Sequence, residues 1–258
     1  MFTELNSILN ASPDSLTPGE FILLSDRRSD ASFLIHHFLS FYLRARCRVC
    51  FLGLVQSFSH YSAVSQRLGV SLTQAKEKGQ LVFMEGLKEA LSTLIPQASS
   101  SGSQAMDFLR DPAAGLRSLY EFVRSSAADS GAAGGWGPPV LLVDDLGVLL
   151  SLGVRAGAVL DFSHYCRAAV CSQLQGNVVM LLRCDGEEEE EEEEVGEEEG
   201  SGWLLRGLTH QCSLSLHVEV CWRRRRRDAQ HKQKQIFQYK VHDKGASFFA
   251  RGTSSAVL

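Results

Sequence analysis

The sequence predicts an α/β fold with a central, mostly parallel sheet flanked by helices, and antiparallel strands appended at the C-terminus. Short, unbroken apolar runs recur through the first three quarters of the chain, and such runs suit strands buried on both faces. Segments with helical apolar spacing separate these runs, as crossovers between parallel strands require. The chain has 258 residues, the size of one large α/β domain, so we expect a single domain over residues 1–258.

Strands and helices are predicted to alternate before residue 184. The strands are rich in Val, Ile, Leu and Phe and are expected at residues 21–24, 49–55, 81–84, 140–143 and 177–182. The helices are expected at residues 1–10, 31–44, 59–68, 108–123 and 156–174. Asp30 is expected to be the N-cap of the second helix, Gly69 follows the third as its C′ residue, and Pro112 interrupts the fourth.

The pattern changes after residue 183. Residues 185–202 contain runs of glutamate that cannot pack, and we expect them to form a disordered acidic insertion. Alternating apolar and polar residues then predict strands at 214–220, 236–241 and 246–250. A turn ending in Gly245 joins the last two strands. All three are expected to be antiparallel strands added to the sheet.

Composition predicts a cytoplasmic protein, and leaves a nuclear location open as well. The seven cysteines are scattered, which favours reduced thiols over a disulfide framework. Residues 1–10 lack the features of a signal peptide, and no apolar run approaches the roughly 18 residues of a membrane span. Cys47 and Cys50 form a C-x-x-C pair, but no second pair follows and the histidines show no metal-ligand spacing. No metal site is therefore expected, because structural zinc needs four ligands.

The net charge of −4 conceals a basic body. Residues 187–194 and 197–199 are all glutamate and supply 11 of the 30 acidic residues; 30 minus 11 leaves 19 against 26 Lys and Arg, a balance of +7. A basic body favours polyanionic partners. One arginine run, with Trp222, Phe237 and Tyr239 nearby to stack on bases, is a candidate for RNA contact, with a solvated loop or a nuclear-localisation signal as alternatives. The run consists of Arg223, Arg224, Arg225, Arg226 and Arg227.

Two aspartates, Asp144 and Asp145, directly follow the apolar run at 140–143. They fall at the carboxyl end of a predicted parallel strand, where open α/β sheets bind ligands. Nucleotide hydrolases place there an Asp that holds magnesium. The alternatives for Asp144 are capping of the following segment and a polar contact in a subunit interface.

If Asp144 holds magnesium for a nucleotide, the chain should also contain a phosphate-binding loop. The first predicted strand, turn and helix provide the context for the motif G-x-x-x-x-G-K-[ST]. The matching window places Ser25 and Asp30 at the glycine positions, Ala31 at the lysine and Ser32 at the hydroxyl. Only Ser32 fits, and Asp30 would repel phosphate. The sequence therefore predicts a degenerate loop that does not bind nucleotide by itself.

The order of strand, degenerate loop, helix, second strand and VLLVDDL is similar to the RecA-type ATPase fold, and the sequence resembles the family of sixth subunits of the Elongator complex. QSFSHY at 56–61 and VLLVDDL at 140–146 are specific to this resemblance. It is carried by stretches that include both halves of the chain, at residues 33–42 (FLIHHFLSFY), 49–65, 68–72, 79–87, 139–152 and 248–258.

The resemblance implies a RecA-like subunit without the ATPase loop. It implies a hetero-oligomeric ring, expected to be a hexamer, with two paralogous Elongator subunits. It also implies contact with the remaining subunits and with tRNA, whose wobble uridine Elongator modifies at the fifth carbon. RecA-like ATPases place a water-activating glutamate after the second strand, where this chain has Gln56 and Ser57.

We therefore expect an accessory subunit with no catalytic residue and no cofactor; Elongator's radical chemistry belongs to another subunit. The alternative is a catalytically idle RecA-like paralogue that binds DNA in recombination or chromatin. In a ring of this kind, protein contacts must replace nucleotide at the junction, and we expect them along residues 25–32, 56–61 and 144–150. Aromatic residues often dominate interface energies. The candidate apolar anchors are Phe58, Tyr61 and Leu146.

Overall fold

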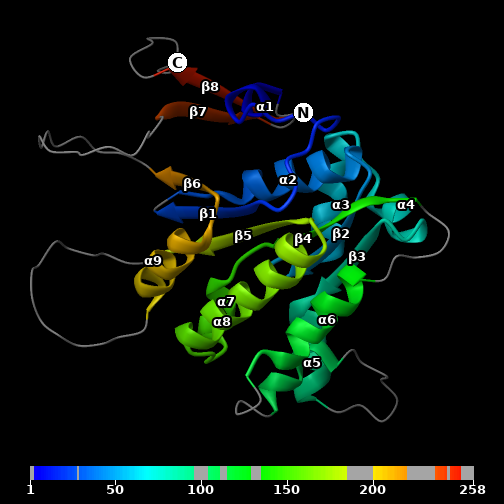
Figure 1. The fold of residues 1–258 in the computed structure, drawn as a ribbon, viewed down its shortest axis with the longest axis vertical. Coiled ribbons are helices and arrows are strands. Elements are labelled where there is room, and N and C mark those ends of the chain that lie inside the picture. Colours follow the sequence, from blue (N-terminus) through cyan, green and yellow to red (C-terminus); the bar gives the residue numbers. More distant parts are fainter. Residues whose placement is uncertain are drawn as a thin grey trace, which may run out of the picture.

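The fold is known from a computed structural model (Figure 1). It describes residues 3–27, 29–95, 104–110, 115–128, 135–184, 200–219, 236–242 and 245–250. The arginine run at 223–227 and most of the acidic tract therefore lie outside the described residues.

A parallel sheet of six strands forms the centre, in the order β3-β2-β4-β5-β1-β6. Its strands are β1 (Phe21–Arg27), β2 (Cys47–Gly53), β3 (Leu81–Glu85), β4 (Gly137–Val143), β5 (Asn177–Arg183) and β6 (Leu214–Glu219). The apolar runs that predicted the first five strands are buried in it. The prediction of a mostly parallel sheet is confirmed, and parallel pairing brings all six carboxyl ends to one edge.

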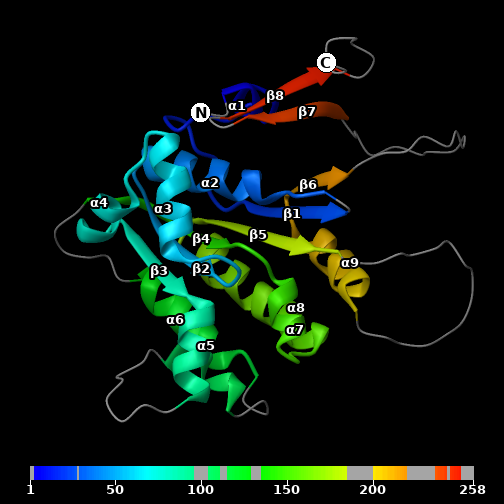
Figure 2. The ribbon, with the colours of Figure 1, turned by 180° about the vertical axis from the view of Figure 1, so that it is seen from behind.

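Helices cover both faces of this sheet, as two views from opposite sides show (Figures 1 and 2). One face carries α1 (Thr3–Ile8), α2 (Ser32–Arg44), α3 (Phe58–Arg67) and α4 (Leu72–Glu77). The other carries α5 (Gly86–Leu94), a 3-10 segment (Gln104–Leu109), α6 (Arg117–Ala128), α7 (Gly147–Ser151), α8 (Ala156–Cys166) and α9 (Ser201–Gln211). Within β4, Leu141 and Val143 face the second layer whereas Val140 and Leu142 face the first, which explains why the whole run is apolar. A π-helical segment, Arg167–Gln173, continues α8 over the predicted length.

The C-terminal strands differ in part from the prediction. β6 is parallel to β1 and belongs to the main sheet, so its predicted antiparallel direction is wrong. The physical reason is α9, which carries the chain back across the sheet before β6 begins. Because α9 begins at Ser201, it also shortens the predicted acidic insertion, of which residues 185–199 lie outside the described part of the chain.

The last two strands, β7 (Phe237–His242) and β8 (Gly245–Ala250), are antiparallel as predicted but form a separate two-stranded sheet. This sheet packs over the first helix layer, where the ring of Tyr239 stacks on Phe33 at a centroid distance of 5.3 Å. It also contacts α1, because Glu4 accepts a hydrogen bond of 2.7 Å from the backbone N–H of Phe248. Figure 1 shows α1, β7 and β8 together at one end of the molecule.

Candidate functional site

The carboxyl edge of the sheet gathers polar side chains from four strands that are distant in sequence. Asp26 of β1 lies in register with Arg183 of β5. Ser25 of β1 is in register with His217 of β6, and Asp145 follows β4. This is the edge at which α/β sheets bind ligands, so its geometry decides what the chain can bind there.

The degenerate phosphate loop begins inside a strand and not in a turn. β1 runs to Arg27, so the prediction of a polar turn from Ser25 onward is wrong for Ser25 and Asp26, which are both buried. The side chains of Ser25 and His217 share a hydrogen bond of 2.9 Å. This pairing across the β1–β6 ladder extends the strand, and no glycine interrupts it. The window therefore lacks the flexible loop that wraps a phosphate.

The first backbone amides of α2 already have acceptors from within the chain. The N–H of Ala31 donates to Oδ2 of Asp26 at 3.0 Å, and the N–H of Ser32 donates to Oδ1 of Asp30 at 2.8 Å. The N-cap residue is Ala31 and not Asp30, although the Asp30 side chain does bind an amide of the first turn. Amides at a helix start are the groups that bind phosphate in nucleotide sites. Here carboxylates of the chain occupy them.

Asp144 acts inside the chain and not as a magnesium ligand or a helix cap. Its carboxylate is 2% exposed and accepts hydrogen bonds from the N–H groups of Leu54 (2.7 Å), Val55 (3.1 Å) and Gln56 (3.4 Å). It also accepts a hydrogen bond of 2.9 Å from the phenol of Tyr61. Burial raises the pKa of Asp144, and these donors lower it in part. The carboxylate thus fixes the turn after β2. Because it is buried and bound to these donors, it neither caps the segment that follows β4 nor reaches a subunit interface.

The capping role belongs to the neighbouring carboxylate. Asp145 accepts a hydrogen bond of 2.7 Å from the N–H of Gly147, the first residue of α7, and one of 3.3 Å from the N–H of Arg183. Burial raises the pKa of Asp145 to about 6, and these two amides and the Arg183 charge oppose the rise. A Cβ atom at residue 147 would lie 2.9 Å from Oδ1 of Asp145, so a larger residue there would force the capping carboxylate to shift.

Arg183, which the sequence patterns did not single out, supplies the positive charge of this edge. Its Nη2 lies 3.2 Å from Oδ1 of Asp30, while its Nε lies 3.8 Å from Asp26 and 3.9 Å from Asp145. One signal in the sequence could have identified it. Arg183 is the last residue of a buried parallel strand, and a charged residue there lies at the carboxyl edge of the sheet. A cation from the chain therefore neutralises the carboxylates that surround the degenerate loop.

Two of the three predicted interface anchors are core residues. Tyr61 is 3% exposed and Leu146 is 0% exposed, so neither side chain is available to a partner and their prediction as apolar interface anchors is wrong. Tyr61 points inward because its phenol binds Asp144, and Leu146 belongs to the core between the sheet and the second helix layer. Phe58 is half-buried, with its ring 5.3 Å from that of Phe83 and 5.1 Å from Nζ of Lys76. Phe58 stays a candidate for an interface anchor.

Other chemistry has little support in the described ranges. No group of three or more His, Cys, Asp or Glu side chains among the described residues is arranged to hold a metal ion. Burial raises the pKa of the Cys47 thiol to about 11 and that of Cys50 to about 12, so this C-x-x-C pair lies in β2 as two inert thiols. No helix in the described part of the chain combines the length and apolarity of a membrane span.

Comparisons with known proteins identify the family. A family model described as Elongation complex protein 6 matches residues 2–243. The chain belongs to this family. It is 63% identical over 273 residues to Elongator complex protein 6 of Danio rerio and 50% identical over 277 residues to that of Homo sapiens, with both chains covered in full in each case.

A solved structure shows the same fold. The chain is similar to an uncharacterized protein from Pyrococcus horikoshii, crystallised in complex with an unknown peptide, with a TM-score of 0.59 and 13% identity. The likeness covers 97% of this chain and 98% of that one. The predicted RecA-like fold is thereby confirmed for this member of the Elongator complex protein 6 family.

Proposed function

We propose that this Elongator subunit is non-catalytic and acts in a RecA-like hetero-oligomeric ring with two paralogous subunits, helping to hold tRNA during modification of its wobble uridine. The observation that carries the non-catalytic part is the occupation of the α2 amides by Asp26 and Asp30. A phosphate entering there would have to displace two carboxylates and would meet their negative charge. The chain also has Ala31 where a lysine would neutralise phosphate.

Exposed apolar side chains support a role in an assembly. Four large apolar residues on or next to α5 are exposed by 54% to 61%: Leu87, Leu91, Leu94 and Ile95. Their spacing places them along one side of the helix, where apolar patches commonly mark protein contacts. Family membership supports other Elongator subunits as the partners, and it favours this function over a paralogue acting on DNA.

Contact with tRNA is supported by the charge of the chain. The balance of +7 outside the glutamate tracts and the run at Arg223–Arg227 would attract a polyanion. The run lies outside the described residues, so this part of the proposal rests on sequence and family alone.

Nucleotide binding and assembly test the proposal separately. We expect the isolated chain to show no ATP hydrolysis and no ATP-dependent rise in melting temperature, because ligands stabilise only a state that binds them. Turnover by the pure chain that changes in an Arg183→Gln variant would contradict the non-catalytic role. Native mass spectrometry after co-expression with the two paralogous Elongator subunits is expected to give a hetero-oligomer containing this chain. A chain that stays monomeric in that experiment excludes the ring.

A further inference from the structure

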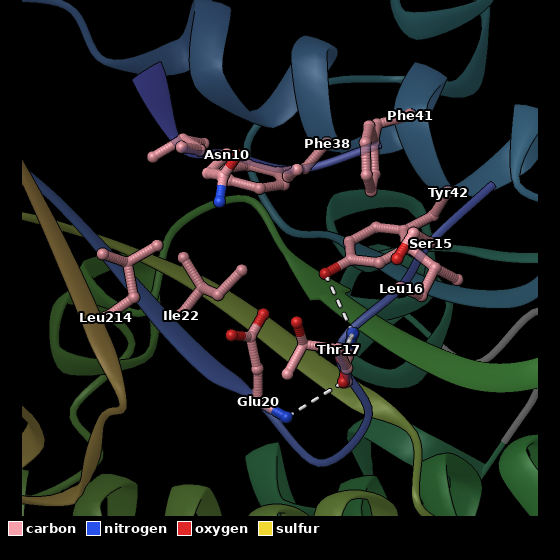
Figure 3. A pocket seen from close by; sticks show the side chains of 13 residues that line it. Asn10, Ser15, Leu16, Thr17, Glu20, Ile22, Phe38, Phe41, Tyr42 and Leu214 are labelled. Atoms are coloured by element: carbon pink, nitrogen blue, oxygen red, sulfur yellow. Dashed lines mark hydrogen bonds between the residues drawn. The ribbon is translucent and has the colours of Figure 1, made fainter. Parts of the chain in front are cut away.

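A small cavity lies at the amino edge of the sheet, opposite the degenerate phosphate loop (Figure 3). Its volume is about 70 Å³, and it lies between α2 and the segment that leads into β1. Polar groups on its walls come from Asn10, Thr17 and Glu20, and aromatic rings come from Phe38, Phe41 and Tyr42. No step of the proposed function uses this cavity.

The carboxylate of Glu20 is the charged group of the cavity. The backbone of Glu20 is fully engaged: its N–H donates 2.9 Å to Oδ1 of Asn177, and its C=O accepts from the N–H of Val178 and the thiol of Cys171. Its side chain, by contrast, has no hydrogen bond or ion pair to any described residue. Figure 3 shows the carboxylate directed into the open space and away from the strand. Partial burial raises the pKa of this carboxyl group, so a cation placed beside it would stabilise the charged form.

Asn177 holds the floor of the cavity rigid. Its side-chain amide donates 3.0 Å to the C=O of Thr17 and 3.3 Å to the phenol oxygen of Tyr42, while its oxygen binds Glu20. Asn177 is itself buried. This network fixes the backbone of Glu20 and the position of the Tyr42 ring before any ligand arrives, so little ordering has to accompany binding.

Aromatic rings line the side that faces Glu20. Phe38, Phe41 and Tyr42 lie three and four residues apart on α2 and therefore share one face of the helix. Phe41 packs edge-on to Tyr42 at 5.2 Å between centroids, and Phe38 stacks on Tyr42 at 6.2 Å. Rings of this kind attract cations through their faces, and a carboxylate binds a cation that carries N–H donors more strongly than a neutral group.

The size of the cavity limits what can enter. A volume of 70 Å³ corresponds to about five water-sized spaces. Complete small-molecule sites occupy about 300–1,000 Å³. The cavity therefore takes only the end of a longer group. Glu20 excludes an anion, and an apolar group would leave the carboxylate without a partner.

We propose that this cavity binds the guanidinium or ammonium end of a basic ligand, with Glu20 as its counter-ion and the α2 rings as its walls. The hydroxyl of Thr17 supplies a further acceptor at the rim. The same chemistry has two sources: an arginine or lysine side chain of another Elongator subunit, or a free amine or guanidine. The first source rests on the proposed assembly, whereas the cation site itself does not.

Amide chemical shifts of the full-length chain test the site directly. Methylguanidinium and ethylammonium chloride, against matched sodium chloride, are expected to shift the amide signals of Thr17, Gly19 and Glu20 in a saturable way. Glu20→Gln keeps the side-chain volume and is expected to weaken binding about tenfold or more, because it removes a charged acceptor. Glu77→Gln, at an exposed position on α4, is the matched control and should bind like the original chain.

Methylurea provides a comparison that needs no variant. It has the shape of methylguanidinium without the charge, so it should cause no saturable shift of the original chain. This comparison stays informative even if Glu20→Gln alters folding. Equal binding of methylurea and methylguanidinium, or no saturable binding of either cation, overturns the proposal. Unchanged binding by a folded Glu20→Gln variant does so as well.

The assembled complex distinguishes the two sources. If a partner side chain fills the cavity, methylguanidinium binding should disappear once the chain is incorporated with the other subunits, and Glu20→Gln should weaken incorporation about tenfold. If the ligand is a free amine or guanidine, the assembled chain should still bind methylguanidinium with unchanged affinity. Failure of the ring to form would contradict the proposed function. The cation site would still be tested by the amide chemical shifts of the isolated chain.

Discussion

The phenol of Tyr61 donates a hydrogen bond of 2.9 Å to Oδ2 of Asp144, which lies 83 positions later in the chain. This contact joins α3 to the end of β4. Three backbone N–H groups that follow β2 bind the same carboxylate. The position that holds a metal ion in nucleotide hydrolases therefore serves here to fix a turn and a helix of the same chain.

The Tyr61→Phe variant removes one donor from this carboxylate and leaves the ring in place. We expect it to lower the free energy of unfolding by about 1–3 kcal/mol, the typical cost when a buried charged acceptor loses a partner. Urea denaturation of the isolated chain measures the change. Tyr165→Phe is the matched control, because Tyr165 is 57% exposed. A loss no larger than in this control would show that the contact contributes little.

Sequence patterns predicted the strands of the main sheet because unbroken apolar runs reflect burial on both faces, as Val140 and Leu141 illustrate by facing opposite layers. They did not predict α4, α5, α7 or α9. α5 begins at Gly86 directly after β3, without the turn residues that normally separate elements. The direction of β6 depended on α9, so one missed helix reversed the prediction for a strand.

The candidate site was harder to predict than the fold. The degenerate phosphate loop was found because its motif has a fixed spacing. The burial of Tyr61 was missed because α3 is mostly polar, and its inward side is set by Asp144, a residue distant in sequence. Arg183 was missed because its partners Asp26 and Asp145 come from other strands, and their meeting depends on strand order.

The burial of His36 is expected to lower the free energy of unfolding in acid. Burial lowers its pKa from 6.5 to about 4, with the nearby His60 adding to the effect. As pH falls from 6.5 to 4, His36 becomes protonated in the unfolded chain but stays neutral in the folded chain. The free energy of unfolding therefore falls over this interval. At about 1.4 kcal/mol per pH unit, the loss due to His36 is about 3 kcal/mol.

The His36→Gln variant isolates this effect. Between pH 7 and pH 4 it should lose about 3 kcal/mol less unfolding free energy than the original chain. The raised pKa of Asp145 acts in the opposite direction but is common to both proteins, so it cancels in the difference. The surface variant His164→Gln serves as the control. Parallel pH profiles for the original chain and His36→Gln would refute this assignment.

Arg183 is predicted to hold the acidic edge together. Arg183→Gln leaves the buried carboxylates of Asp26 and Asp145 without their cation, and we expect a loss of about 1–3 kcal/mol, less than for a fully buried pair because Arg183 is partly exposed. The pKa of Asp145 should also rise above about 6, since the Arg183 charge lowers it. Urea denaturation and carboxyl NMR titration measure the two effects. Arg183→Lys, which keeps the charge, should recover part of both.

Phe58 is the remaining candidate for an interface anchor. Phe58→Ala is expected to weaken co-purification with the paralogous subunits by about 2 kcal/mol or more, the typical cost at a binding hot spot. The isolated variant should keep its circular-dichroism melt. By contrast, Tyr61→Ala should destabilise the isolated chain, because that side chain belongs to the core. Wild-type yield of the Phe58→Ala complex would remove Phe58 from the interface.

The arginine run is predicted to bind phosphate groups of tRNA. Replacing Arg223–Arg227 with alanine should weaken tRNA binding by the assembled ring and reduce the log–log salt slope by roughly 0.7 to 0.9 for each phosphate that the variant no longer neutralises. Fluorescence anisotropy at several salt concentrations measures both. A variant in which the exposed Lys78 and Lys88 are replaced instead tests whether loss of positive charge elsewhere on the surface has the same effect per charge. Unchanged affinity and slope would assign the run to a solvated loop or a targeting signal.

β1 lies between β5 and β6, although it precedes both in the sequence. The N–H of Phe21 bonds to the side chain of Ser213, 192 positions later. A ribosome adds about 5–20 residues per second, so β1 waits on the order of ten seconds or longer for its second neighbour. One edge of β1 has no neighbouring strand during that interval, and we expect the nascent chain to depend on molecular chaperones until β6 has left the exit tunnel.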